Sequence, residues 1–372
     1  MKKILLLIVI MALITTVAAW LRYGGGQPYT DLSTSPVMAE SALEEVLSYR
    51  LPIGNVAVSR SGRVFYTVHP EARPKGNKLL EFVDGASVPF PDGASQGKLF
   101  DTVLGVVIDR FDRLWTIDHG NHGLHTARLL AFDINTGGLL HDQAFDREIA
   151  PRGSFLQDIQ VSTDGRTVVI ADASFWRKRP ALIVYDIGTA TAKRILESHP
   201  SVSAENYLIR NRNRTMSFMG GIFSLRGGVD GIALGDQWLY FGALSGSSLY
   251  RVRLDDIRDS SIPNTQIAAR VERVSDKPLS DGFSIDNDGR VYITDVEHNA
   301  IFRLDQGSQL RTLLRSDRVR WPDALSFGPD GWLYIADRAL GDVVLKSKDH
   351  IKRKGPYKIF RVQLDVEGTP GQ

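Results

Sequence analysis

Aspartates stand at recurring places in this 372-residue chain, beside pairs of short apolar segments. An aspartate or asparagine precedes the first segment of a pair at Asn55, Asp158, Asp230, Asp281 and Asp323. An aspartate follows the second segment at Asp118, Asp172, Asp295 and Asp337. If one surface gathered these carboxylates, protons, backbone N–H groups or a cation would have to offset their repulsion. The cation could be Ca²⁺ or another divalent metal, which takes oxygen ligands, or the amine of a small ligand. Aspartates also cap backbone N–H groups at strand ends without any ligand, so both interpretations stay open.

Three histidines, His119, His122 and His125, follow the second copy of this pattern. Histidines bind transition metals and transfer protons near neutral pH, although a solvent-facing loop is the simpler interpretation. If the protein moves a proton, we expect His119 or a carboxylate such as Asp281 to act as general acid/base. The chain has no cysteine and no G-x-S-x-G, Walker or H-E-x-x-H motif, so covalent catalysis has no support.

The elements that must position these residues are hairpins that recur six times. The copies begin near residues 55, 105, 158, 230, 281 and 323, about every 50 residues. This period, with about four strands per copy, predicts an all-β, six-bladed β-propeller. Because the first strand of each blade lines the channel and the second returns to the same end, the residues named above should gather on one rim. Residues 43–54 resemble the segments before the last two copies, so an N-terminal strand should close the last blade beside residues 357–364.

The N-terminus has the composition of an export signal. Lys2 and Lys3 precede an apolar run, and small residues end it at Ala19. We therefore expect residues 1–19 to be a signal peptide, with residues 4–21 as an uncleaved anchor in the alternative interpretation. Residues 20–42 should be a linker, 43–366 the propeller and 367–372 a tail. The body then lies outside the cytoplasm, either periplasmic or secreted.

Composition limits the partners. The formal net charge of +2 equals the contribution of Lys2 and Lys3, so the body is neutral and nucleic acid is not expected as a partner. We expect a monomer that takes a small-molecule ligand and meets a membrane only through an uncleaved N-terminal segment. A long insertion at residues 205–228 is either a packed loop or a lid over the channel. The basic stretch 346–358 is either a solvated face or a contact for an anionic envelope surface.

At the level of these repeats the chain resembles the yellow and major royal jelly protein family, in particular its bacterial members related to dopachrome tautomerase. The resemblance covers residues 51–364 and rests on residues 113–120, 181–187, 228–234, 248–252, 280–301 and 321–338. It implies a secreted six-bladed propeller whose channel binds small aromatic amines in some members, with dopachrome tautomerisation attributed to parts of the family. Asp337, beside Arg338, stands where the family often has asparagine near the ligand channel, which would suit a cationic ligand.

The chain is more distantly similar to gluconolactonase-like hydrolases, which gives the alternative function. Those propellers hold a divalent metal through a glutamate, an asparagine and an aspartate. The matching positions here are Asn55, Asp230 and Asp281, of which Asp281 keeps the residue type, while the glutamate is missing. In that interpretation Asp230 and Asp281 would hold an ion such as Ca²⁺ for lactone hydrolysis. No cofactor is certain from the sequence.

Overall fold

The body of the protein is a ring of six β-sheets, which confirms the predicted six-bladed propeller. The computed structural model describes residues 1–212, 214–307 and 309–372, and six four-stranded antiparallel sheets lie within them. Blades 1 and 2 consist of β2 (Ile53–Val58), β3 (Val64–Val68), β4 (Leu79–Val83), β5 (Ala86–Pro89), β6 (Val103–Ile108), β7 (Arg113–Asp118), β8 (Arg128–Asp133) and β9 (Leu139–Ala144). Blades 3 and 4 consist of β10 (Leu156–Val161), β11 (Thr167–Asp172), β12 (Ala181–Asp186), β13 (Thr191–Ile195), β18 (Val229–Leu234), β19 (Trp238–Ala243), β20 (Ser248–Arg253) and β21 (Glu272–Asp276). Blades 5 and 6 consist of β22 (Phe283–Ile285), β23 (Val291–Asp295), β24 (Ala300–Asp305), β25 (Gln309–Arg315), β26 (Pro322–Phe327), β27 (Trp332–Asp337), β28 (Tyr357–Gln363) and β1 (Glu44–Tyr49).

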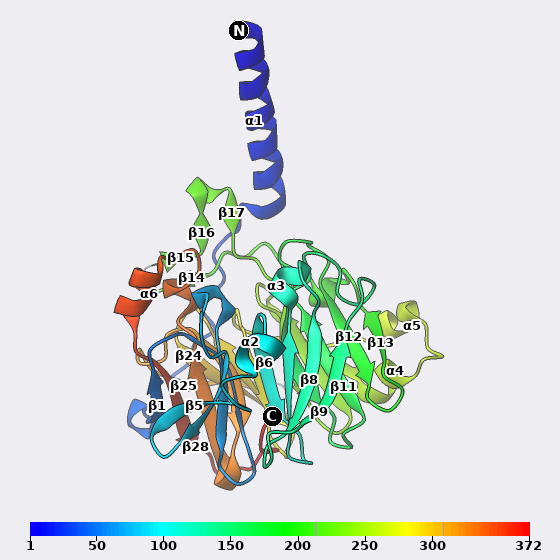
Figure 1. Cartoon of the computed structure of the whole chain (residues 1–372), viewed down its shortest axis with the longest axis vertical. Helices are drawn as coiled ribbons and strands as arrows, with labels where there is room; N and C mark the ends of the chain where they lie inside the picture. Colours follow the sequence, from blue (N-terminus) through cyan, green and yellow to red (C-terminus); the bar gives the residue numbers. More distant parts are fainter. Residues whose placement is uncertain (213, 308) are drawn as a thin grey trace.

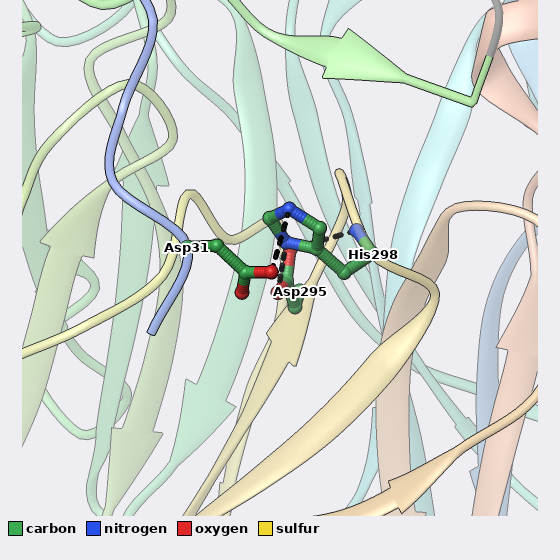
Figure 2. A group of neighbouring side chains, drawn as sticks. All are labelled: Asp31, Asp295 and His298. Carbon is green, nitrogen blue, oxygen red and sulfur yellow. Dashed lines mark hydrogen bonds and ion pairs between the residues drawn. The ribbon is translucent and has the colours of Figure 1, made fainter. Parts of the chain in front are cut away.

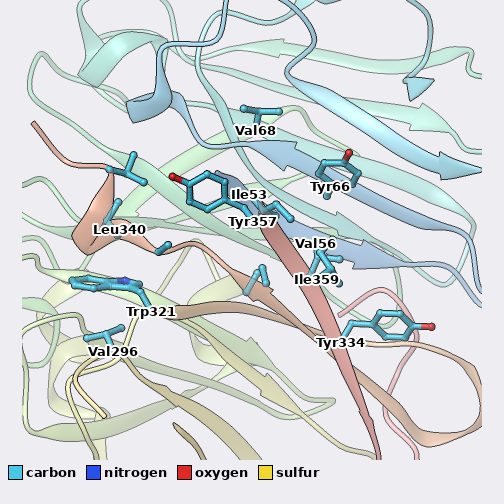
Figure 3. Close-up of a cluster of buried hydrophobic side chains, with 14 of the residues drawn as sticks. Ile53, Val56, Tyr66, Val68, Val296, Trp321, Tyr334, Leu340, Tyr357 and Ile359 are labelled. Carbon is cyan, nitrogen blue, oxygen red and sulfur yellow. The ribbon is translucent and has the colours of Figure 1, made fainter. Parts of the chain in front are cut away.

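The ring closes where the first and last parts of the chain meet. The N-terminal strand β1 pairs with β28 in blade 6, as predicted, and β2 lies beside both β6 and β26. A hydrophobic core fills the space between blades 6 and 1, with Trp321 and Tyr357 among its fully buried side chains (Figure 3). Leu47 of β1 belongs to the same core. Closure therefore rests on apolar burial as well as on the backbone ladder.

Most helices are short and lie in the connections between strands. They are α2 (Gln96–Leu99), α3 (Gly120–Gly123), α4 (Leu254–Arg258), α5 (Asn264–Ala269) and α6 (Lys348–Lys354). The basic stretch 346–358 thus contains a helix, α6. The insertion forms two small hairpins, β14 (Arg210–Asn211) with β15 (Arg214–Thr215) and β16 (Ser217–Phe218) with β17 (Phe223–Ser224). Figure 1 shows these hairpins at the end of the propeller from which α1 projects.

Of the segments outside the ring, the linker packs against it, whereas helix α1 projects away from it (Figure 1). Helix α1 (Lys2–Tyr23) has no buried residue and is long and apolar enough to cross a membrane, a test that signal sequences also pass. The linker then lies along the body: Gln27 pairs with Tyr207, and the Val37 N–H donates to the carbonyl of Thr312.

The tail of the propeller enters the channel at the end opposite to α1. The N–H of Gly371 donates to the carbonyl of Phe327, and the carbonyl of Gly371 accepts from the N–H of Ile108. The side chain of Gln372 donates to the carbonyl of Val161. These bonds join the first strands of blades 2, 3 and 6 across that end of the channel.

Candidate functional site

An irregularity in the first strand of five blades aims the predicted residues at the channel. The pairing of β10 with β11 skips two residues between Leu156 and Ile159, and the same break recurs in β2, β6, β18 and β26. The skipped residues are 54–55, 104–105, 157–158, 230–231 and 323–324. Because a β-bulge re-aims side chains at a strand end, Asn55, Asp158, Asp230 and Asp323 face the channel axis instead of the hydrophobic layers between blades.

Blade 5 reaches the same arrangement just before β22 begins. The backbone N–H groups of Asp281 and Gly282 donate to the hydroxyl of Thr294 at 3.2 and 3.0 Å. A Cβ at position 282 would collide with the carbonyl of Asp323, so the Asp-Gly pair is needed for this close approach.

A pocket of about 260 Å³ opens above these bulges, at the end of the channel that bears α1. Its floor is polar and includes Gln157, Asp230, Asp281 and Arg338. Its wall is mainly aromatic and aliphatic, with Phe155, Phe175, Trp176, Phe218, Phe223 and Leu244. An apolar cavity with a few convergent polar groups is the usual form of a small-molecule site.

Arg338 is the cation of the pocket floor, and its side chain is only 3% exposed. Its guanidinium Nη1 donates to Asp281 Oδ2 at 2.6 Å, and its Nε lies 3.0 Å from Asp323 Oδ2. The indole Nε1 of Trp321 donates to the same Asp281 oxygen at 2.6 Å. Two donors thus fix the carboxylate of Asp281 through one oxygen, and Oδ1 remains without a donor among the described residues.

Asp230 lines the pocket, whereas Asp158 and Asp323 line a smaller neighbouring cavity, and all three hold protons more tightly than an exposed aspartate does. Burial, the charge of Asp281 and a hydrogen bond with it raise the pKa of Asp230 well above its usual value. Burial likewise raises the pKa of Asp323, although Arg338 opposes the shift. The pKa of Asp158 rises to about 7, mainly through burial, while the N–H groups of Ile159 and Ile232 oppose the change. Asp230 and Asp281 therefore face the pocket as two hydrogen-bonded carboxyl groups, and Asp230 holds its proton more tightly than an exposed aspartate does.

A divalent metal does not fit this floor. Asp281 Oδ2 is already bonded to Arg338 and Trp321, and the permanent positive charge of Arg338 stands beside the would-be ligand Asp281. Asn55 Oδ1, the third ligand of the lactonase-like interpretation, accepts the N–H of Val56 at 2.8 Å. Arg338 already neutralises part of the charge that a divalent ion would neutralise.

The aspartates that follow the second strands are arranged differently. Asp118 accepts the N–H groups of Asp101, Thr102 and Gly120, and Asp172 accepts those of Phe155 and Ser174. Two of these carboxylates also pair with arginines: Asp172 with Arg194 at 2.9 Å and Asp337 with Arg320 at 2.6 Å. Their oxygens are thus used to hold loops, as in the capping interpretation.

Asp295 belongs to this second set and forms a chain of charges with the linker (Figure 2). Its Oδ2 lies 2.8 Å from Nδ1 of His298, whose Nε2 lies 3.5 Å from Asp31 Oδ2. The bond to Asp295 raises the pKa of His298. The three side chains are close enough to be considered as metal ligands, but Asp295 and His298 already use the facing atoms on each other. The group is therefore an ion-pair chain that attaches the linker to blade 5.

His119 is not among the residues that line the pocket; among the described residues, His69 and His122 line it instead. Nδ1 of His119 accepts the N–H of His122 at 2.9 Å, and its ring lies edge-on to Phe155. Burial lowers the pKa of His119 well below its usual value, so this imidazole is neutral. The ring of His122 stacks on Phe155 at a centroid distance of 4.5 Å.

Comparison with known proteins shows which family the chain belongs to. The model of the major royal jelly protein family matches residues 101–325, more than half of the chain. The chain belongs to the major royal jelly protein family. It is 30% identical to major royal jelly protein 6 of Apis mellifera over 175 residues, 44% of this chain and 38% of that protein. It is 28% identical to major royal jelly protein 7 of the same organism over 200 residues, 49% of this chain and 41% of that protein. The matches thus span about two fifths of these curated relatives.

Solved structures share the fold of this royal jelly family member at low identity. A luciferin-regenerating enzyme superposes with a TM-score of 0.58 at 12% identity, over 88% of this chain and 97% of that one. A gluconolactonase from Xanthomonas campestris superposes with a TM-score of 0.56 at 14% identity, over 91% and 98%. These likenesses show the propeller fold and confirm the more distant structural similarity to gluconolactonase-like proteins.

The sequence pattern alone did not identify several residues at or near this pocket. Gln157 was overlooked because the strand pattern hides which residue of a bulge faces the pocket. Phe155 was overlooked because it precedes β10 and lies outside the strand pattern. Trp321 was visible only as part of a family motif, without its bond to Asp281. Lys277, which is outside the lining of the pocket, is fully buried, donates to the carbonyl of Pro278 at 3.0 Å and has its pKa lowered to about 7 by burial. A lone lysine in a loop carries no sequence signal of that kind.

Proposed function

We propose that this protein binds a small aromatic amine in the pocket above Asp230 and Asp281. Two carboxyl oxygens buried at the floor of the aromatic-walled pocket, Asp230 Oδ2 and Asp281 Oδ1, support this most. Apart from the hydrogen bond between the two carboxyl groups themselves, no donor among the described residues reaches these oxygens. Leaving such atoms unbonded is costly, and an ammonium group supplies the missing donors. Aromatic rings of the ligand then pack between Phe155 and Phe218.

We further propose that the same two carboxyl groups move a proton when the ligand can tautomerise. In such a reaction a proton leaves one atom of the ligand and another proton is returned elsewhere on it. Asp281, oriented by Arg338 and Trp321, would accept the first proton on Oδ1, and protonated Asp230 would donate the second. His119 would contribute only indirectly, through His122.

We propose that the protein acts outside the cytoplasm. Lys2 and Lys3 precede the apolar helix α1, and a basic end before an apolar segment directs export with the basic end left inside. Protease treatment of intact spheroplasts of an expressing bacterium should degrade the propeller. Full protection of the body inside the cells would contradict export.

Amine binding is tested with a matched pair of probes. Tyramine and 3-(4-hydroxyphenyl)propionate share the phenol ring and differ in the charge of the side chain, so calorimetric titration of both separates charge from shape. We expect tyramine to bind and the acid not to bind. Asp230→Asn and Asp281→Asn should each weaken tyramine binding about tenfold or more, because a charge-assisted hydrogen bond is lost.

The matched control is Asp236→Asn, which removes an exposed carboxylate at the opposite end of the blade 4 hairpin. It should bind tyramine as the unmodified chain does. Equal affinity for the phenolic acid, or tyramine binding unaffected by both pocket substitutions, would contradict the proposal. Proton transfer is followed separately through the loss of dopachrome colour, which Asp281→Asn should slow.

A further inference from the structure

The mouth of the pocket carries five apolar side chains, of which three are exposed and two half-buried. We call them the collar: Phe175, Trp176, Phe218, Met219 and Leu345. Met219 is 71% exposed, Leu345 67% and Trp176 45%, which is unusual for three large apolar residues around one opening. Contiguous exposed apolar surface of this kind marks contact with a partner or a membrane.

The C-terminal end of helix α1 lies at this collar. Its last residue, Tyr23, donates its hydroxyl hydrogen to the carbonyl of Trp176 at 2.8 Å, and its ring stacks on Phe223 at 5.5 Å. Arg22 donates to the carbonyl of Arg177 at 2.9 Å. The helix has 22 residues and no buried side chain, and Figure 1 shows it pointing away from the propeller beside β16 and β17. At about 1.5 Å per residue it matches the hydrocarbon core of a bilayer, roughly 30 Å thick.

Cationic groups gather where the helix meets the collar. Lys178 donates to the carbonyl of Arg226 at 3.1 Å, and Arg226 donates to the carbonyl of Gly24 at 2.6 Å. Burial and the nearby charges of Arg226 and Arg22 lower the pKa of Lys178 to about 8. An anionic lipid headgroup at this place would relieve the repulsion, and tryptophan, tyrosine and lysine are the residues typical of membrane interfaces.

We propose that α1 spans a membrane, that the collar lies in the surface of that same membrane, and that the pocket takes an amphiphilic amine directly from the bilayer. The inference rests on the pocket proposed above and adds the source and class of its ligand. Because α1 leaves the bilayer at Tyr23, the residues that contact Tyr23 are held within one side chain of the interface. Phe175 and Trp176, which contact Tyr23, therefore lie at the lipid surface while α1 spans the membrane, and the other collar residues line the same opening.

The geometry also sets the orientation of the ligand. The carboxyl pair lies at the floor and the apolar ring at the mouth, so an amphiphile enters with its amine first and leaves its apolar part at the collar. Residues 368–372 cross the other end of the channel, so entry from that end is obstructed. A ligand that partitions into the bilayer reaches the collar at a higher local concentration than it has in water.

The depth of the collar can be measured with a site-specific probe, because the chain has no cysteine of its own. Met219→Cys and Leu345→Cys are labelled with the fluorophore NBD in the full-length protein, reconstituted into phosphatidylcholine–phosphatidylglycerol vesicles. Phe111→Cys is the matched control, since Phe111 is a 51% exposed apolar residue between β6 and β7, at the other end of blade 2. We expect a blue shift and loss of most NBD fluorescence to nitroxide-labelled acyl chains at positions 219 and 345, with neither change at position 111.

The ligand is tested in the same vesicles with dodecylamine as the probe. Dodecylamine should displace tyramine from the full-length protein, and Asp281→Asn should weaken both amines. Unquenched labels at positions 219 and 345 together with intact tyramine binding would overturn the membrane position of the collar and leave the amine pocket standing. Quenched labels without any tyramine binding would instead overturn the amine pocket. Quenched labels and tyramine binding that dodecylamine does not displace would overturn supply from the bilayer.

Discussion

At the scale of single residues, aspartate serves two purposes in this protein. Those before or within the first strands, such as Asp230 in a bulge and Asp281 just before β22, face the pocket with oxygens that receive no N–H donor among the described residues. Those after the second strands, such as Asp172, bond backbone N–H groups and an arginine. Desolvation acts on both sets and raises the pKa of Asp118 and Asp337 as well, but the second set is bonded by backbone N–H groups and, at Asp172 and Asp337, paired with an arginine. The first set is therefore the one in which proton and ligand binding are coupled.

One prediction at this scale concerns Arg338, whose positive charge offsets the negative charge of Asp281 and Asp323. Arg338→Met should lower the free energy of unfolding by about 3–5 kcal/mol near pH 7, because it leaves buried carboxylates unpaired. The folded-state pKa values of Asp230 and Asp323 lie above the unfolded value. Ionisation of these two buried groups therefore lowers the free energy of unfolding increasingly as pH rises above about 4, and this loss vanishes below that pH. The deficit of the variant should therefore shrink as pH falls towards 4, which urea unfolding at several pH values measures.

The control for this prediction is Arg128→Met, which breaks a partly exposed pair with Asp142 on the outer strands of blade 2. Its cost should be at most about 1 kcal/mol and nearly independent of pH above 5. A deficit in Arg338→Met that stays constant between pH 7 and about 4 would show that lost packing, and not uncompensated charge, destabilises the variant.

At the scale of elements, the hairpins were predictable and the bulges were not. Alternating apolar residues and tight turns identify the two inner strands of each blade. The sequence pattern predicted that Asn55, Asp158 and Asp230 share a rim. It did not show which of these residues faces the pocket, because a bulge inserts residues without breaking the apolar pattern. The second set was predicted for the same rim because it ends the same hairpins. Its backbone bonds depend on loop conformations that spacing does not encode.

Another prediction at this scale concerns His298, which attaches the linker to blade 5. The pKa of His298 is raised in the folded protein by its bond to Asp295. Its stabilising effect is thus fully present below the unfolded pKa of about 6.5 and is lost as pH rises through the folded pKa. We expect His298→Gln to cost about 1 kcal/mol near pH 6, a figure reduced for partial exposure, and less near pH 9. Chemical unfolding at both pH values tests this, and a cost that grows with pH would contradict it.

At the scale of the whole molecule, the ring and its closing strand follow from the repeats, whereas the packing of the terminal segments does not. Six copies of one pattern specify six blades, and a seventh edge-like stretch at residues 43–54 indicates the closing strand. The linker and the tail have no repeat partner and no periodicity. Their positions depend on bonds such as Gly371 to Phe327 and Val37 to Thr312, which exist only once the ring has formed.

We expect closure by β1 to make the propeller unfold as a single cooperative unit, and a substitution at Leu47 tests this. Leu47 is buried in the core between blades 6 and 1, while its neighbour Ser48 is exposed on the same strand. Leu47→Ala should lower the free energy of unfolding by about 2–4 kcal/mol, the usual cost of a buried cavity. Because each blade packs on two neighbours, tryptophan fluorescence and far-ultraviolet circular dichroism should still report one coincident transition. Ser48→Ala should leave stability within about 0.5 kcal/mol of the unmodified chain. Two separate transitions in Leu47→Ala would mean that blade 6 opens alone and that the ring is held chiefly by its other contacts.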